Sequence, residues 1–162
     1  NVARHELGNV EVIGAAVADH AGTITLKRSS FNTGDHRIDS AQSARGVEVP
    51  MVSLDEWIEE HGIEPDVIKM DVQGAEPLVL AGMRNVLEGN QPLHMFLEFA
   101  PAMLRSANTD PRELLQRLTE CGFVMYIIDE RQPGSVEASV EDVMSACPAR
   151  SYINLHCIRD AR

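Results

Sequence analysis

Polar side chains that can carry chemistry are concentrated in one short segment of this chain. Lys69, Asp71, Gln73 and Glu76 lie within eight residues of one another, and a further carboxylate, Glu98, ends the next apolar stretch. A carboxylate in such a place can remove a proton from a reacting group. A lysine beside it can hold that carboxylate or lower the pKa of a neighbouring group. Several carboxylates together can also bind a divalent cation through oxygen.

The elements that must position these side chains are two strands and the helix between them. Residues 66–71 and 93–98 have the composition of strands, and residues 74–87 have apolar side chains at helical spacing. Ligands of open α/β sheets bind at the carboxyl ends of the strands. If the two strands are neighbours, Asp71 and Glu98 lie side by side at that edge. Lys69 points to the same side of the sheet as Asp71, and the carboxylates nearby are its expected partners.

The rest of the chain also alternates between strands and helices. A capping box at Ser53 predicts a helix that ends near Gly62, and Asp110 followed by Pro111 predicts the start of another. Residues 131–149 read as irregular, with one turn of helix around 141–145. The other expected strands are residues 10–13, 15–18, 23–26, 47–49 (stopped by Pro50), 124–128 and 152–158. The pattern predicts one α/β domain over residues 1–162, a doubly wound, mostly parallel sheet whose last strand is antiparallel.

Several motifs, in order, resemble those of one protein family. The string Asp66-Val-Ile-Lys-Met-Asp-Val-Gln-Gly-Ala-Glu76, followed by Val79-Leu-Ala-Gly82, is similar to the signature D-h-h-K-h-D-V-E-G-A-E and vL-x-G of the FkbM methyltransferases. Gln73 stands where that family usually has Glu, which weakens any role for a carboxylate there. Further upstream and downstream matches are Ala16–Gly22 (A-V-s-D-x-x-G), Asn32–Gly34 (N-x-G), Val52–Asp55 (v-x-L-D) and Leu97-Glu98 with Pro101.

The resemblance implies an S-adenosylmethionine-dependent methyltransferase with a Rossmann-like sheet ordered 3-2-1-4-5-7-6. It implies methylation of a hydroxyl group on a small-molecule or sugar-like acceptor. It places Asp19 near the adenine of the cofactor, and we expect Ala18 and Asp71 to contact the cofactor as well. The loop with Asn32, Gly34 and His36 is either part of a lid over the acceptor or a plain solvated hairpin.

A hydroxyl acceptor benefits from a base that removes its proton, and Asp71 or Glu76 is the candidate for it, with Lys69 and Glu98 beside them in the catalytic site. Three alternatives stay open. Lys69, Asp71 and Glu98 can form an ion-pair network with a structural role only. Asp71, Glu76 and Glu98 can instead bind the metal ion of a hydrolase. The chain can also be a non-catalytic fragment.

One expected part of the fold is missing from the sequence. Strand 1 of such a sheet ends in a glycine-rich cofactor loop, yet no G-x-G-x-x-G occurs anywhere in the chain. We therefore expect a domain truncated at its N-terminus, beginning just before strand 3. The strand at 66–71 would then keep an unpaired edge, through which two copies of the chain can associate.

Composition excludes some classes of partner. The net charge of −11 argues against nucleic acid and against anionic membrane surfaces. No apolar run approaches the roughly 20 residues that span a bilayer. Cys121, Cys147 and Cys157 are widely spaced, which argues against zinc and favours free thiols in a reducing cytoplasm. The expected partner is a small-molecule acceptor.

Overall fold

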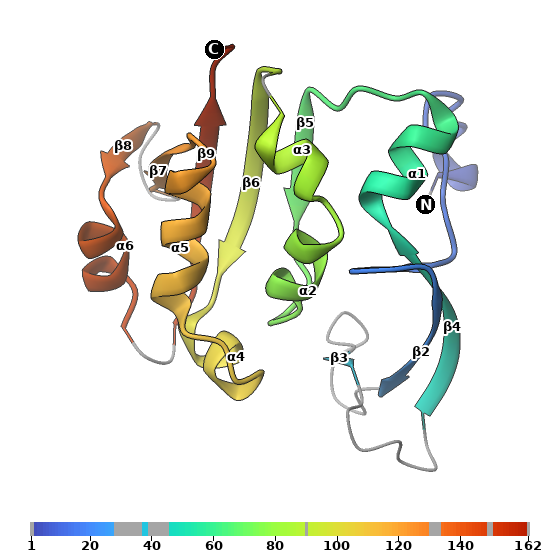
Figure 1. Ribbon diagram of the computed structural model, residues 1–162, viewed down its shortest axis with the longest axis horizontal. Coiled ribbons are helices and arrows are strands. Elements are labelled where there is room, and N and C mark those ends of the chain that lie inside the picture. The colour runs from blue at the N-terminus through green and yellow to red at the C-terminus, as the bar shows by residue number, and fades with distance from the viewer. Residues whose placement is uncertain are drawn as a thin grey trace.

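A computed structural model describes residues 2–27, 37–38, 46–89, 91–129, 134–148 and 151–161, which form two β-sheets and six α-helices (Figure 1). The first sheet has the strand order β1-β4-β2-β3. Strand β1 (Ala16–Ala18) is parallel to β4 (Gly46–Ser53). Strand β2 (Gly22–Lys27) is antiparallel to β4 and to β3 (Arg37–Ile38). A short 3-10 helix, η1 (Ala3–His5), precedes this sheet.

The second sheet holds most of the core and has the order β5-β6-β9-β7-β8. Strand β5 (Val67–Met70) is parallel to β6 (Leu93–Phe99). Strand β9 (Ile153–Arg159) lies antiparallel between β6 and β7 (Val124–Ile128), and β8 (Ser135–Ala138) forms a hairpin with β7.

The α/β class and the antiparallel last strand are confirmed, but the expectation of one mostly parallel, doubly wound sheet is not. Only one of the four neighbouring pairs in the second sheet, β5 with β6, is parallel. The reason is that β9 inserts between β6 and β7, and β8 adds a further antiparallel pair. Within the described residues, no strand connects β1 to β5, so the strands form two sheets.

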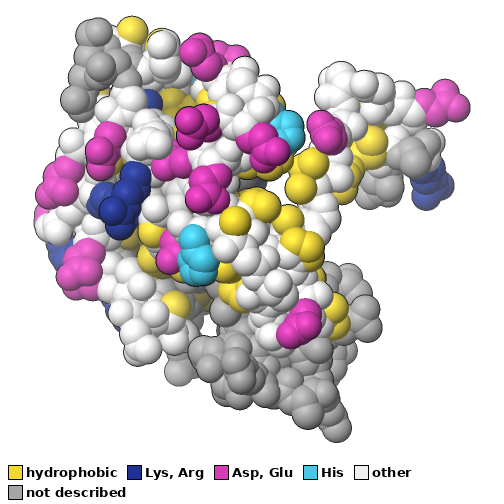
Figure 2. Space-filling view, turned by 45° about the vertical axis from the view of Figure 1, so that its right-hand side comes forward, with side chains coloured by type: hydrophobic (Ala, Val, Ile, Leu, Met, Phe, Trp, Pro, Cys, Tyr) yellow, Lys and Arg dark blue, Asp and Glu magenta, His cyan; other side chains and the backbone are white. Residues whose placement is uncertain are grey.

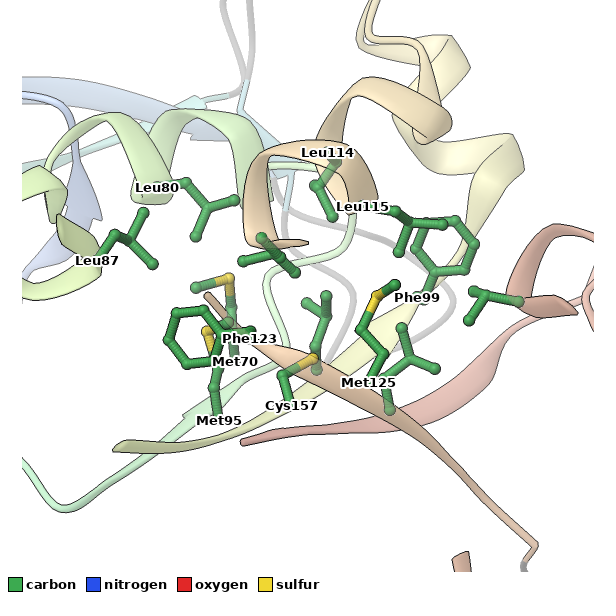
Figure 3. Packing of buried hydrophobic residues seen from close by; sticks show 14 of the residues in the cluster. Met70, Leu80, Leu87, Met95, Phe99, Leu114, Leu115, Phe123, Met125 and Cys157 are labelled. Atoms are coloured by element: carbon green, nitrogen blue, oxygen red, sulfur yellow. The ribbon is translucent and has the colours of Figure 1, made fainter. Parts of the chain in front are cut away.

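Helices cover one face of the second sheet, and the core lies beneath them. Figure 1 shows α2, α3 and α5 in front of the same sheet. Figure 3 shows leucines of these helices meeting Met70, Met95, Phe99, Met125 and Cys157 of the strands.

No described helix is long and apolar enough to cross a membrane. The helices are α1 (Leu54–His61), α2 (Glu76–Ala81), α3 (Arg84–Glu88), α4 (Pro101–Ser106), α5 (Pro111–Glu120) and α6 (Val140–Ala146).

The single helix expected over 74–87 is wrong, because the chain breaks it at Gly82. The carbonyl of Gly82 accepts hydrogen bonds from the N–H of Asp55 (2.8 Å) and from the hydroxyl of Ser53 (3.0 Å). The carboxylate of Asp55 then accepts from the N–H groups of Asn85 and Val86, at the start of α3. The beginning of α1 therefore supplies the partners that end α2 and cap α3.

Two further expectations in the first half of the chain are wrong. Residues 10–13 form no strand, and Val10, Val12 and Ile13 are exposed. Pro50 does not stop its strand, since β4 continues to Ser53. Pro50 lies opposite Thr23 of β2, whereas β1 pairs only with residues 51–53 of β4. A proline that cannot donate to a ladder is tolerated where the strand has a neighbour on one side only.

In the second half, the segment expected to be irregular contains regular structure. It includes β8 and the seven-residue helix α6, which begins with a capping box between Ser139 and Asp142. The helical turn expected around 141–145 lies within α6 and is confirmed. Helix α4 was not expected from the sequence, and it starts at Pro101, directly after β6. Residues 130–133 and 149–150 lie outside the described residues.

The close contact between Gly82 and β1 gives a test of how the two sheets are joined. A Cβ at Gly82 would lie 1.9 Å from the carbonyl oxygen of Ala18, so backbone must move to admit it. We expect Gly82→Ala to lower the free energy of unfolding by about 2 kcal/mol or more, as overpacking does. Chemical denaturation measures this. Gly14→Ala is the control, since its Cβ meets nothing within 4 Å, and an equal effect of both changes would contradict the role of Gly82.

Candidate functional site

The parallel pairing of β5 with β6 brings Asp71 next to Glu98, as predicted. Met70 is aligned with Leu97, so the next residue of each chain segment lies at the same edge of the sheet. The side-chain amide of Gln73 joins the two carboxylates. Its Nε2 donates to Asp71 Oδ1 and to Glu98 Oε1, both at 2.9 Å. One neutral side chain thus fixes the spacing of two acidic ones.

The turn that carries Gln73 has an unusual backbone conformation. Gln73 has φ 52° and Gly74 has φ 97°, so two successive residues are left-handed. A Cβ at Gly74 would lie 3.1 Å from the carbonyl oxygen of Met103 in α4. Gly74 has no Cβ, so it permits both the positive φ and this close approach. A left-handed non-glycine residue such as Gln73 is uncommon and costs free energy, which directs attention to this turn as a functional element.

Glu76 is the buried member of the group. Glu76 is the first residue of α2, directly after the turn, and it is 3% exposed. Oε1 accepts a hydrogen bond from the N–H of Gly74 (3.1 Å), whereas Oε2 has no hydrogen-bond partner in the part of the chain that the structure describes. Burial raises the pKa of Glu76, and the nearby charges of Asp71 and Glu98 raise it further, against the two backbone N–H groups that lower it. Asp71, Glu76 and Glu98 are called the carboxylate cluster below; Gln73 bridges Asp71 and Glu98, and the N–H of Gly74 binds Glu76.

Lys69 neutralises this cluster only weakly. Its Nζ lies 4.0 Å from Asp71 Oδ2, and the two side chains are 58% and 48% exposed. Solvent screens a pair of this kind, so it contributes little to stability. Within the described residues β5 is the edge strand of its sheet, so Lys69 reaches water, and Asp71 is its partner as expected. Acidic side chains are also scattered over the molecular face drawn in Figure 2.

Asp19 and Ala18, the other expected cofactor residues, lie at the far end of α2. Ala18 is fully buried, and its carbonyl is packed against Gly82, which follows α2. Asp19 is partly exposed, and its Oδ1 lies 2.7 Å from Nδ1 of His20. Since α2 has six residues, about 9 Å of helix separates these residues from the carboxylate cluster. The contacts of Ala18 are packing contacts, and its role toward a cofactor stays a prediction.

Gln73 contributes more to the site than we expected from the sequence. Its difference from the usual Glu was interpreted as the loss of a carboxylate, but its amide supplies the donors that bring two carboxylates together. A glutamate there would add a fourth acidic group to the carboxylate cluster. The signal was available, because an amide surrounded by carboxylates in sequence is a natural donor. Asn32, Gly34 and His36 lie outside the described residues.

The geometry gives no support to a metal centre. Among the residues that the structure describes, no group of three or more His, Cys, Asp or Glu side chains is arranged to hold a metal ion. In the carboxylate cluster, the Gln73 amide donates to Asp71 and to Glu98, so one oxygen of each faces a donor. What this arrangement can do is accept a proton at exposed Asp71, beside Glu76, whose pKa is raised by burial.

Comparison with known proteins gives one match. A family model described as the methyltransferase FkbM domain matches residues 2–125, more than three quarters of the chain. The match includes β1, the turn at 71–76 and the whole carboxylate cluster, and it ends within β7. No curated protein and no solved structure matches the chain.

The buried carboxyl group of Glu76 makes stability depend on pH. Because its pKa is raised in the fold, the folded state holds the proton more tightly than the unfolded chain does. Stability from this group is therefore present below the ordinary pKa of Glu, about 4.3, and is lost as pH rises through the folded pKa. Glu76→Gln removes the titration, so we expect the variant to gain stability relative to the wild type as pH increases from about 4 to 7.

Denaturant midpoints of both proteins, measured across this pH range, test the expectation. Glu88→Gln, at an exposed position of α3, is the matched control and should show no such trend. A difference between wild type and Glu76→Gln that stays constant with pH would show that Glu76 is ionised in the folded protein as readily as in the unfolded chain.

Proposed function

Because the chain belongs to the FkbM methyltransferase family, we propose that it transfers a methyl group from S-adenosylmethionine to a hydroxyl group of a small or sugar-like molecule. The observation that carries this proposal is the carboxylate cluster, which lies at the carboxyl ends of two neighbouring parallel strands inside the matched region. Ligand sites of open α/β sheets lie at that edge.

The strand order supports the Rossmann-like part of the proposal. The spatial order of neighbouring strands in the second sheet includes β5, β6, β9 and β7, and β9 is antiparallel to both of its neighbours. With β5 as strand 4, this order corresponds to the 4-5-7-6 half of the seven-strand methyltransferase sheet. In the same assignment β1 is strand 3, and the expected strands 1 and 2 would lie between β1 and β5.

The carboxylates of the site are suited to binding such a cofactor. Carboxylates accept hydrogen bonds from hydroxyl groups and attract positive charge, and S-adenosylmethionine offers ribose hydroxyls and a positively charged sulfur. Asp19, Ala18 and Asp71 would hold it, at the two ends of α2. When bound, it supplies the methyl group: the acceptor oxygen bonds to the methyl carbon, and the carbon–sulfur bond breaks with its electron pair on sulfur.

The residues of the chain contribute positioning and proton transfer. Asp71 is exposed and takes the proton of the acceptor hydroxyl, for which a carboxylate within hydrogen-bond reach is suited. Gln73 fixes the orientation of Asp71 and Glu98 through its two hydrogen bonds. Glu76, whose pKa is raised by burial, accepts a hydrogen bond from the N–H of Gly74 and lies at the start of α2. Holding the acceptor in line with the methyl group supplies the larger part of the rate.

The role of Asp71 predicts a loss of turnover on substitution. We expect Asp71→Ala to lower turnover at least about tenfold with the fold intact, because loss of a general base typically costs 10²-fold or more. The measurement is release of S-adenosylhomocysteine at saturating cofactor by the full product of the gene, with mass spectrometry to identify the methylated atom. Asp66→Ala is the matched control, since Asp66 is an exposed aspartate at the opposite end of β5. Equal turnover of both variants would mean that Asp71 does not take part.

Cofactor binding gives a separate test of the donor. We expect the 162-residue chain by itself to bind S-adenosylmethionine weakly, because its sequence contains no glycine-rich cofactor loop. Calorimetry measures this. Micromolar binding by the 162-residue chain as a monomer would mean that the cofactor site is built from other residues. In a separate assay, release of phosphate or of another hydrolysis product would favour a hydrolase.

A further inference from the structure

A cavity of about 610 Å³ lies beside the turn at 71–76, between α2 and the end of α4. Its apolar wall includes Val72, Leu78 and Met103, and its polar groups include Gln73, Asn108 and Thr109. Small-molecule sites typically have volumes of about 300–1,000 Å³ and combine apolar walls with a few polar groups. The cavity therefore has the size and lining of a ligand pocket.

None of the described residues that line this cavity carries a formal charge. This is unusual for a chain in which 24% of the residues are charged and the net charge is −11. A charged ligand group inside would lose its hydration without gaining a lining partner of opposite charge, which is costly. An anionic group would in addition lie close to the carboxylate cluster. The lining thus selects for a neutral molecule.

Both walls of the cavity are shaped by left-handed residues. Gln73 (φ 52°) and Gly74 (φ 97°) form one wall, and Asn108 (φ 58°) turns the chain after α4. The second turn is held by backbone hydrogen bonds, from Asn108 to Arg105 and from Thr109 to Leu104, both 3.0 Å. The turn at Asn108 is an ordinary helix ending with a left-handed residue, whereas Gln73 has an uncommon conformation of the kind that occurs at ligand sites. The walls of the cavity are therefore formed before a ligand binds.

Gln73 connects this cavity to the carboxylate cluster. The residue lines the cavity, and its side-chain amide donates to Asp71 and Glu98. Asp71 itself does not line the cavity, but Gln73 lines it and contacts Asp71, so a molecule seated in the cavity lies next to the residue that holds the group we assign as base. We propose that this cavity is the acceptor subsite, and that it takes a neutral, largely apolar molecule which presents a hydroxyl group to Asp71. The inference rests on the proposed function and narrows its substrate class.

Two probes of the same shape and different charge test the charge selection. 2-Naphthylmethanol is neutral and carries a hydroxyl group, whereas 2-naphthoate is an anion. Amide chemical shifts of the ¹⁵N-labelled chain, recorded during titration, report both affinity and place. We expect the alcohol to shift amides of residues 72–81 and 103–109 and to bind at least about tenfold more tightly than the carboxylate, which corresponds to about 1.4 kcal/mol. Equal affinities, no binding of the alcohol, or shifts elsewhere would overturn the proposal.

Filling the cavity tests its location. Ala107→Trp puts a large side chain at an exposed position of the lining, and we expect it to weaken binding of the alcohol at least about tenfold. Ala81→Leu, on the opposite wall, is a second and smaller filling change. Ala146→Trp is the control, because Ala146 is also an exposed alanine but lies at the end of α6. Thermal unfolding of each variant verifies the fold, and unchanged binding in both folded filling variants would contradict the assignment.

The binding readout separates this inference from the proposed function. If the alcohol binds in the cavity and the full product of the gene transfers no methyl group, the subsite stands and the methyltransferase mechanism fails. If methyl transfer proceeds and Ala107→Trp leaves the KM of the acceptor unchanged, the mechanism stands and the subsite is wrong.

Discussion

The parallel pairing of β5 with β6 is the constraint on which the rest of the site depends. Parallel strands cannot be joined by a tight turn, so the chain must cross the sheet between them. Helices α2 and α3 make this crossing and cover one face of the sheet, where Leu80 and Leu87 enter the core (Figure 3). The same pairing aligns the ends of the two strands, which puts Asp71 beside Glu98. The pairing of β5 with β6 therefore determines both how the helices pack on the core and where the carboxylate cluster lies.

The carboxylate cluster shows how three acidic side chains are accommodated in one place. Gln73 satisfies one oxygen of Asp71 and one of Glu98, and Gly74 satisfies one oxygen of Glu76. Burial raises the pKa of Glu76. Asp71 meanwhile stays half exposed, with Lys69 at 4.0 Å. The result is one accessible carboxylate held near a buried carboxyl group whose pKa is raised, a contrast of environments that is found where acid and base roles are divided.

The contact between Gly82 and Ala18 joins this site to the first sheet. Because the end of β1 is packed directly against the break between α2 and α3, Asp19 has a fixed place relative to the helix that starts at Glu76. Ser53 and Asp55 secure the same break from α1. Three segments that are distant in sequence thus meet at one glycine, and the spacing between the expected cofactor residues follows from the length of α2.

The sequence by itself determined the elements whose signals are local, and the tertiary structure decided the rest. The caps at Ser53 and Asp110 predicted α1 and α5, because a cap depends on residues two or three positions away. Apolar runs predicted β5 and β6, and the motif at 66–76 identified the family that the comparison confirms. The helix break at Gly82, the bridge from Gln73 to Glu98 and the burial of Glu76 required the folded chain. Each depends on a contact between segments 25 or more residues apart, or on packing around them, and neither periodicity nor capping patterns contain that information.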